Sequence, residues 1–179
     1  KMLSEVNIIN VADDITLSIA KFKVIPGKKC RECERIAARE LIRATLSDDG
    51  IQICHNKHGK PIIDNYNVSI SHTKGYIAII LSKKHIVGID IEYNSDRVNR
   101  ITSKYLRDDE PPTSTENNLI IWCIKEATYK LFSEDMLSFS EMKVSLVDNE
   151  YALVTNLKRM SSHKAYFKIT DNYTLAYIY

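Results

Sequence analysis

The sequence lacks several features that would assign it directly to a class. No apolar stretch approaches the roughly 20 residues that a membrane-spanning helix needs, and the first residues lack the continuous apolar segment of a signal peptide. The net charge of +2 is too small to indicate nucleic-acid binding. There is no repeat at a fixed period and no low-complexity tract. We therefore expect a cytoplasmic protein that binds neither membrane nor nucleic acid.

Cysteine is also scarce, and its positions do not form a metal-site pattern. Cys30 and Cys33 make one C-x-x-C pair, while Cys54 and Cys123 stand alone. A zinc site would need two further ligands at matching spacing. The pair also lies within a charged helical pattern rather than at the strand-to-helix junction of a redox motif. We expect reduced thiols rather than a metal or disulfide role.

The hydrophobic pattern predicts an α+β protein with two similar lobes. Residues 15–23 fit either a short helix or an extended arm, and the strands at 76–82 and 85–92 are spaced like a hairpin. Each half has one long helix followed by strands, so we expect lobes at residues 1–84 and 85–179, each a long helix packed on a small, mainly antiparallel sheet. The predicted helices are 28–46, 97–105 and 119–132, with an exposed polar loop at 108–118; the predicted strands are 3–11, 51–54, 67–71, 76–82, 85–92, 141–147, 150–155, 164–170 and 173–179.

An apolar run that contains two carboxylates is the first segment with chemical potential. In Val87–Glu92 (VGIDIE), Asp90 and Glu92 are two residues apart, so in a strand they share one face. An unpaired buried carboxylate is costly, so this face must meet water, a cation or a basic partner. Taken alone, such a pair is usually an exposed strand face.

The second such segment is Trp122–Lys130 (WCIKEATYK), in which Trp122, Glu126 and Lys130 recur every four residues. On a helix they share one face, which by itself could be solvated and carry an ion pair. Together with the two strand carboxylates, however, a helix carboxylate suits a hard divalent cation. A lysine one turn further on suits phosphate. We expect Trp122 to pack in the core beneath Glu126.

The two segments resemble the signature of the 4'-phosphopantetheinyl transferase superfamily, which contains a G-I-D-x-E strand and a W-x-x-K-E-A-x-x-K helix. Three further pieces resemble the family in the same order along the chain. His58–Pro61 (HGKP) is similar to its G-[KR]-P turn, and Ser69–Thr73 (SISHT) is similar to the end of its S-H-S strand. Lys104–Leu106, followed by Glu110, is similar to its R-F-[FL]…E stretch.

The resemblance implies a fold and a reaction. Because a full lobe precedes the G-I-D segment, the chain is similar to the larger, monomeric class with a pseudo-twofold fold. That class transfers the 4'-phosphopantetheine arm of coenzyme A to a serine of an acidic acyl or peptidyl carrier protein and releases 3',5'-ADP. The reaction depends on Mg²⁺, although Mn²⁺ stays open as the preferred ion. The pathway of the carrier, whether fatty-acid, polyketide or peptide synthesis, also stays open.

The resemblance further implies roles for individual residues. Asp90, Glu92 and Glu126 would bind the metal. Glu126, directly or through a water, is the candidate base, and Lys130 would reach the pyrophosphate, so the catalytic group is Asp90, Glu126 and Lys130. The residues that would contact coenzyme A are Lys28, Arg31, Lys60, Ser71, His72 and Lys130.

The first long helix carries a basic stripe, because Arg31, Arg35, Arg39 and Arg43 recur every four residues. The stripe could be a solvated face paired with nearby glutamates. It could also bind phosphate near its first turn, with Lys28 and Arg31, or meet an acidic carrier protein. These three interpretations stay open.

Two other functions compete with transfer. One is a catalytically weak module that binds coenzyme A or a carrier protein, which the intact Asp90, Glu92, Glu126 and Lys130 argue against. The other is a divalent-metal phosphohydrolase, although the sequence lacks the usual two-metal cluster of histidines and aspartates.

Overall fold

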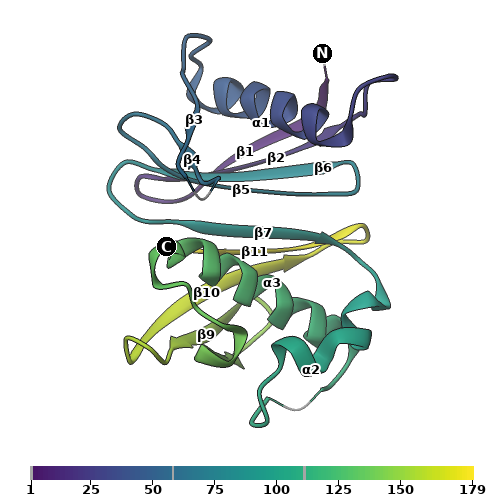
Figure 1. Ribbon diagram of the computed structural model, residues 1–179, viewed down its shortest axis with the longest axis vertical. Coiled ribbons are helices and arrows are strands. Elements are labelled where there is room, and N and C mark those ends of the chain that lie inside the picture. Colours follow the sequence, from purple (N-terminus) through teal and green to yellow (C-terminus); the bar gives the residue numbers. More distant parts are fainter. Residues whose placement is uncertain (1, 58, 111) are drawn as a thin grey trace. The chain divides into compact units, whose positions relative to one another are not determined.

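The chain is an α+β protein made of two compact units, as the computed structural model shows (Figure 1). The structure describes residues 2–57, 59–110 and 112–179. The first unit ends at Val87 and the second spans Gly88–Tyr179. Each unit has one helix of 17 residues packed on an antiparallel sheet. His58, part of the predicted H-G-K-P turn, lies outside the described residues.

Four antiparallel strands make the sheet of the first unit, in the order β1-β2-β6-β5. The segment at 15–23, for which the sequence allowed a short helix or an extended arm, is a strand over Ile15–Phe22. Between α1 and β5 in the chain, β3 and β4 form a separate two-stranded hairpin. The bounds are β1 Leu3–Ala12, β2 Ile15–Phe22, α1 Cys30–Leu46, β3 Cys54–His55, β4 Pro61–Ile62, β5 Asn67–Thr73 and β6 Tyr76–Ser82.

The helix α1 forms where the periodic pattern predicts one. Ala37, Leu41 and Ile42 are fully buried on its inner face, against the sheet. The helix ends at Ser47, which adopts a left-handed conformation with φ of 52°. Burial of this apolar face leaves Arg31, Arg35 and Arg39 of the arginine stripe exposed, whereas Arg43 is half-buried.

The hairpin predicted between β6 and the next strand, β7 (Gly88–Tyr93), is wrong. β6 instead pairs with β5 and with β2, so both of its edges are already bonded. The tight β5-β6 turn contains Gly75, whose φ of +72° is a conformation that glycine adopts without strain. β7 therefore has no free edge of β6 to join and pairs with β11 in the other sheet.

The second unit contains a five-stranded antiparallel sheet in the order β7-β11-β10-β9-β8. Helix α3 packs on it, and its apolar residues join those of the strands in one core. Short helices precede and follow α3. The bounds are η1 Asp96–Ile101, α2 Thr102–Tyr105, α3 Thr115–Leu131, η2 Ser133–Asp135, η3 Phe139–Glu141, β8 Met142–Leu146, β9 Tyr151–Asn156, β10 Ser161–Ile169 and β11 Tyr173–Ile178.

The start of α3 differs from the prediction. The helix begins at Thr115 rather than at Leu119, because the Ser114 hydroxyl accepts a hydrogen bond from the Asn117 amide at 3.1 Å and caps the first turn. The preceding loop was expected to be exposed throughout. That expectation is wrong at Glu110, which is only 5% exposed.

Candidate active site

Gly88 allows α3 to approach β7 unusually closely. A Cβ atom at this position would lie 2.0 Å from the Ala127 carbonyl oxygen and 3.0 Å from the Leu131 nitrogen. No side chain fits at such distances, so any other residue would push the helix away from the strand. The close contact brings the carboxylate face of β7 against the helix face that carries Glu126 and Lys130.

Asp90 and Lys130 form an ion pair between this strand and this helix. The Lys130 ammonium donates to Asp90 Oδ1 at 2.8 Å and to the Ile89 carbonyl at 3.0 Å. The Asp90 side chain is buried, while that of Lys130 is 28% exposed. The Lys130 ammonium therefore uses two N–H groups within the protein while its side chain is partly exposed to solvent. Its third N–H can donate to another acceptor.

Glu92 lies on the same face of β7 as Asp90, as strand alternation predicts. Its Oε1 accepts a hydrogen bond from the indole nitrogen of Trp122 on α3 at 3.2 Å. Trp122 is half-buried and packs against the rings of Tyr105 and Phe139, at centroid distances of 5.2 and 5.3 Å. Trp122 therefore orients one of the predicted metal ligands, besides packing in the core.

Glu126 lines a pocket of about 430 Å³ in the second unit. Its walls carry apolar, hydroxyl-bearing and charged side chains, contributed by α2, α3 and η3 with the two residues before it. Glu126 is half-buried there. Its lining residues are Lys104, Glu126, Tyr129, Leu137, Ser138, Phe139 and Ser140.

The three carboxylates repel one another. Burial raises the pKa of Glu126 from 4.5 to about 7, the charge of Asp90 adds to this increase, and Lys130 opposes it. Burial also raises the pKa of Glu92, again with a contribution from Asp90. Perturbed pKa values of this kind cluster at functional sites.

The donor set suits a hard divalent cation, because Mg²⁺ prefers carboxylate oxygens. A positive ion would also relieve the repulsion that raises the pKa of Glu126 and Glu92. Among the described residues, no group of three or more His, Cys, Asp or Glu side chains already surrounds one point as metal ligands do. Asp90 is held by Lys130 and Glu92 by Trp122. The chemistry therefore fits, but the side chains are arranged for their present partners.

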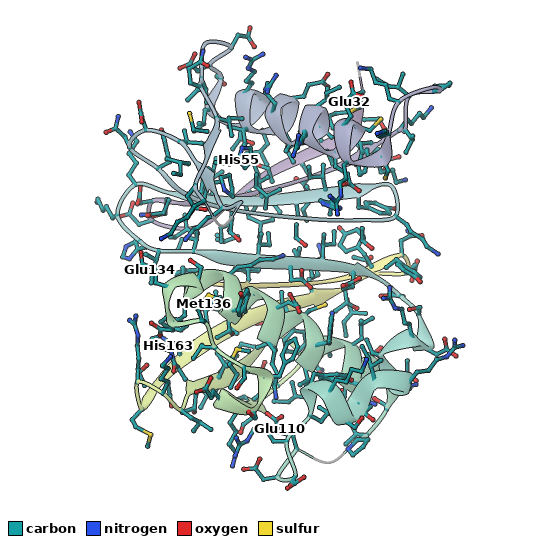
Figure 2. All side chains as sticks on the ribbon, in the orientation of Figure 1. Glu32, His55, Glu110, Glu134, Met136 and His163 are labelled. Atoms are coloured by element: carbon teal, nitrogen blue, oxygen red, sulfur yellow. The ribbon has the colours of Figure 1, made fainter. Side chains whose placement is uncertain are left out.

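A second pocket, of about 390 Å³, lies in the first unit along the arginine stripe. Arg31, Arg35 and Arg39 line it together with His72 at the end of β5. His55 of the β3-β4 hairpin, labelled in Figure 2, also lines it. Its lining residues are Arg31, Glu34, Arg35, Ala38, Arg39, Ile53, His55, Gly59, Pro61, Ile70 and His72.

Charge balance in this arginine pocket favours an anion. Glu34 is its acidic lining residue, and its carboxylate lies 3.3 Å from His72 Nδ1. Three guanidinium groups thus face one carboxylate. Arginine forks match phosphate geometry, so the lining suits a phosphorylated ligand.

The other predicted coenzyme A contacts are placed differently. Ser71 is buried between Ile70 and His72, on the opposite face of β5 from the pocket. Lys28 is exposed and forms an ion pair with Glu32. Lys60 lies between two lining residues of the arginine pocket but does not itself line it. The structure therefore brings Arg31 and His72 together, and leaves Lys28 and Ser71 outside this pocket.

Sequence reasoning missed three features of these sites. It did not single out Gly88 as the point of closest approach, although a glycine before a carboxylate strand is a recognisable signal of close backbone packing. It gave Lys125 no role, although this lysine is fully buried. It also missed His55, for which the local sequence carries no signal, because a two-residue strand brings it to the arginine pocket.

Comparison with known proteins places the second unit in a family. A model described as the 4'-phosphopantetheinyl transferase superfamily matches residues 86–178. The match includes β7, α3 and the carboxylate site, whereas the arginine pocket lies before it. A search of curated proteins found no match. None of the helices in the described part of the chain has the length and apolar character to span a membrane.

Proposed function

The chain belongs to the 4'-phosphopantetheinyl transferase superfamily, and we propose that it transfers the 4'-phosphopantetheine arm of coenzyme A to a serine of an acyl or peptidyl carrier protein. The observation that carries this proposal is the group of Asp90, Glu92, Glu126 and Lys130 on β7 and α3. These residues lie within the matched segment and form one acidic cluster with one lysine. The other product would be 3',5'-ADP.

We assign Mg²⁺ binding to Asp90, Glu92 and Glu126. When bound, the ion would offset negative charge on the pyrophosphate of coenzyme A. Burial and the nearby charge of Asp90 make the negative charge of Glu92 and Glu126 unfavourable, and a cation would offset that cost. Trp122 keeps Glu92 in place through its indole N–H.

Lys130 and Glu126 have complementary tasks in the proposed reaction. The Lys130 ammonium is anchored on Asp90 and Ile89. Its third N–H can donate a hydrogen bond to a phosphate oxygen. Glu126 is the candidate base that takes the proton of the carrier serine, directly or through a water. Without a metal ion the pKa of this carboxyl is about 7, and a bound cation would lower it, which keeps Glu126 ionised and able to accept a proton at neutral pH.

We assign the arginine pocket to the nucleotide end of coenzyme A, which carries a 3'-phosphate. Three guanidinium groups and His72 supply donors for a phosphate. Lys60 lies next to this pocket in the β3-β4 turn and is an additional candidate. We keep Lys28 and Ser71 as weaker candidates because neither lines the pocket.

We further propose that the protein acts as a cytoplasmic monomer on an acidic carrier protein. Arg31, Arg35 and Arg39 are exposed on α1, so the same stripe offers positive charge at the protein surface. Exposed positive charge accelerates encounter with an acidic partner, and the effect weakens as salt is added.

Detection of 3',5'-ADP with and without a carrier separates transfer from its two rivals. The protein is incubated with Mg²⁺, coenzyme A and an apo-carrier protein, and the nucleotide products are separated by chromatography. Transfer predicts 3',5'-ADP only when the carrier is present. Release without a carrier would identify a phosphohydrolase, and binding of coenzyme A with no product under any condition would identify a binding module.

A further inference from the structure

Lys125 is a charged residue with no access to solvent. It precedes Glu126 on α3, and its side chain is 0% exposed. Its ammonium donates to the carboxylate of Glu110 at 2.5 Å, to the Tyr105 carbonyl at 2.7 Å and to the Phe139 carbonyl at 3.3 Å. All three donors of the ammonium are thus used within the protein.

Glu110 is equally well bonded. Its side chain is 2% exposed, and it comes from the loop before α3 (Figure 2). Besides Lys125, its carboxylate accepts from the Arg107 amide at 3.0 Å and from the Val144 amide of β8 at 2.5 Å. The pair therefore joins the loop, α3 and the first strand after η3 through directional bonds.

The segments that meet at Lys125 are the walls of the Glu126 pocket. Tyr105 follows Lys104, which lines the pocket from α2. Phe139 lines the pocket itself, from the segment that opens η3. Since α3 supplies both Lys125 and Glu126, one ammonium ties together all three walls.

Stability alone is a weak explanation for such a pair. Moving two charges out of water is expensive, and well-packed apolar residues often replace a buried ion pair with no loss of stability. What apolar residues do not supply is direction, because they do not hold two particular carbonyls at a fixed place. Fully bonded buried networks fix one arrangement of the segments around them.

We propose that Glu110 and Lys125 are positioning residues that hold the walls of the Glu126 pocket in place for the transfer reaction, an inference that rests on the function proposed above. The pair touches no reacting group. It acts through the carbonyls of Tyr105 and Phe139, which fix where Lys104 and Phe139 lie relative to Glu126. Misplacement by about 1 Å can cost about 100-fold in rate.

Two variants separate positioning from folding. Lys125→Met leaves the charge of Glu110 buried without its partner and should lower the melting temperature strongly. The double variant Lys125→Met/Glu110→Gln removes both charges, keeps an acceptor for one of the two backbone amides that donate to Glu110, and should recover part of that loss. Lys143→Met is the matched control, because it breaks an exposed ion pair with Asp109 in the same unit.

The decisive measurement is steady-state kinetics of the double variant, well below its melting temperature. We expect kcat to fall roughly 10- to 100-fold, with KM for coenzyme A within about twofold of the parent. Amide hydrogen exchange at Glu141, whose N–H donates to the Ser138 carbonyl at 3.1 Å, should quicken while β10 stays protected. Lys143→Met should match the parent in every readout.

A double variant with the parent's kcat and exchange would overturn the proposal, as would a loss confined to KM. A failure of the positioning role can be told apart from a failure of the proposed function. If the parent protein modified no carrier, the function would fail, and hydrogen exchange would still decide whether the pair holds the pocket walls.

Discussion

Ionisation of Glu126 should make the folded protein less stable as the pH rises, and a neutral side chain at this position should abolish that loss of stability. The pKa of Glu126 is about 7 in the folded protein, against an ordinary value of 4.5 that applies to the unfolded chain. The folded state therefore binds this proton more tightly. Its contribution to stability is complete below pH 4.5 and is lost as the pH rises through about 7.

The size of the effect follows from the shift in pKa. One pKa unit corresponds to about 1.4 kcal/mol, so the full shift would amount to about 3 kcal/mol. Glu126 is only half-buried, and solvent screening reduces this figure to about 2 kcal/mol. In a chain of this size, such a difference moves the melting temperature by about 4–8 °C.

Thermal unfolding of the parent and of Glu126→Gln, from pH 5 to pH 8 in the presence of a chelator, measures the effect. The two should be nearly equal at pH 5, and the variant should melt higher by several degrees at pH 8. Glu116→Gln is the matched control, because Glu116 is an exposed carboxylate in the first turn of the same helix. Its difference from the parent should stay small and flat.

Magnesium extends the same experiment. If Glu126 is a metal ligand, excess Mg²⁺ should raise the melting temperature of the parent at pH 8 more than that of Glu126→Gln, because a ligand stabilises the folded state that binds it. Parallel melting curves for parent and variant across the whole pH range would refute the account of the carboxylate cluster.

Three further substitutions test other parts of the account. Gly88→Ala should destabilise the second unit by about 1–3 kcal/mol and reduce transfer, because a Cβ would meet the backbone of α3 at 2.0 Å. The control Gly50→Ala, whose Cβ would meet only a flexible side chain at 3.3 Å, should unfold like the parent. Equal melting temperatures for both variants would contradict the close approach. Asp90→Ala should lower kcat/KM for transfer by about 100-fold or more while circular dichroism stays unchanged; full activity would remove Asp90 from the metal site. Arg35→Ala and His72→Ala should each raise KM for coenzyme A roughly tenfold but leave KM for dephospho-coenzyme A unchanged; equal effects on both substrates would dissociate the arginine pocket from the 3'-phosphate.

The periodic elements of the fold were predictable because their signals are local. The helices α1 and α3 follow from apolar residues at helical spacing, and Asp90 and Glu92 share a face because side chains alternate along a strand. Helical spacing also predicts that Glu126 and Lys130, four residues apart, lie on one side of α3. Spacing therefore predicted which of these side chains share a face, while their role as a metal site stays a prediction.

Features that depend on distant partners were not predictable in the same way. The strand after β6 has a hairpin-like spacing, yet it pairs with β11, because β6 already has a neighbour on each edge. Glu110 looks like a loop residue in an acidic, proline-containing stretch, and its burial depends on a lysine 15 positions away. Local sequence carries no record of such partners.

The intact mass of an apo-carrier protein after incubation with this protein, coenzyme A and Mg²⁺ tests the central claim most directly. The account predicts that the carrier gains the mass of one phosphopantetheine arm, that replacement of its acceptor serine by alanine prevents the gain, and that Asp90→Ala prevents it as well. A carrier mass that stays unchanged across fatty-acid, polyketide and peptide carriers would contradict the account.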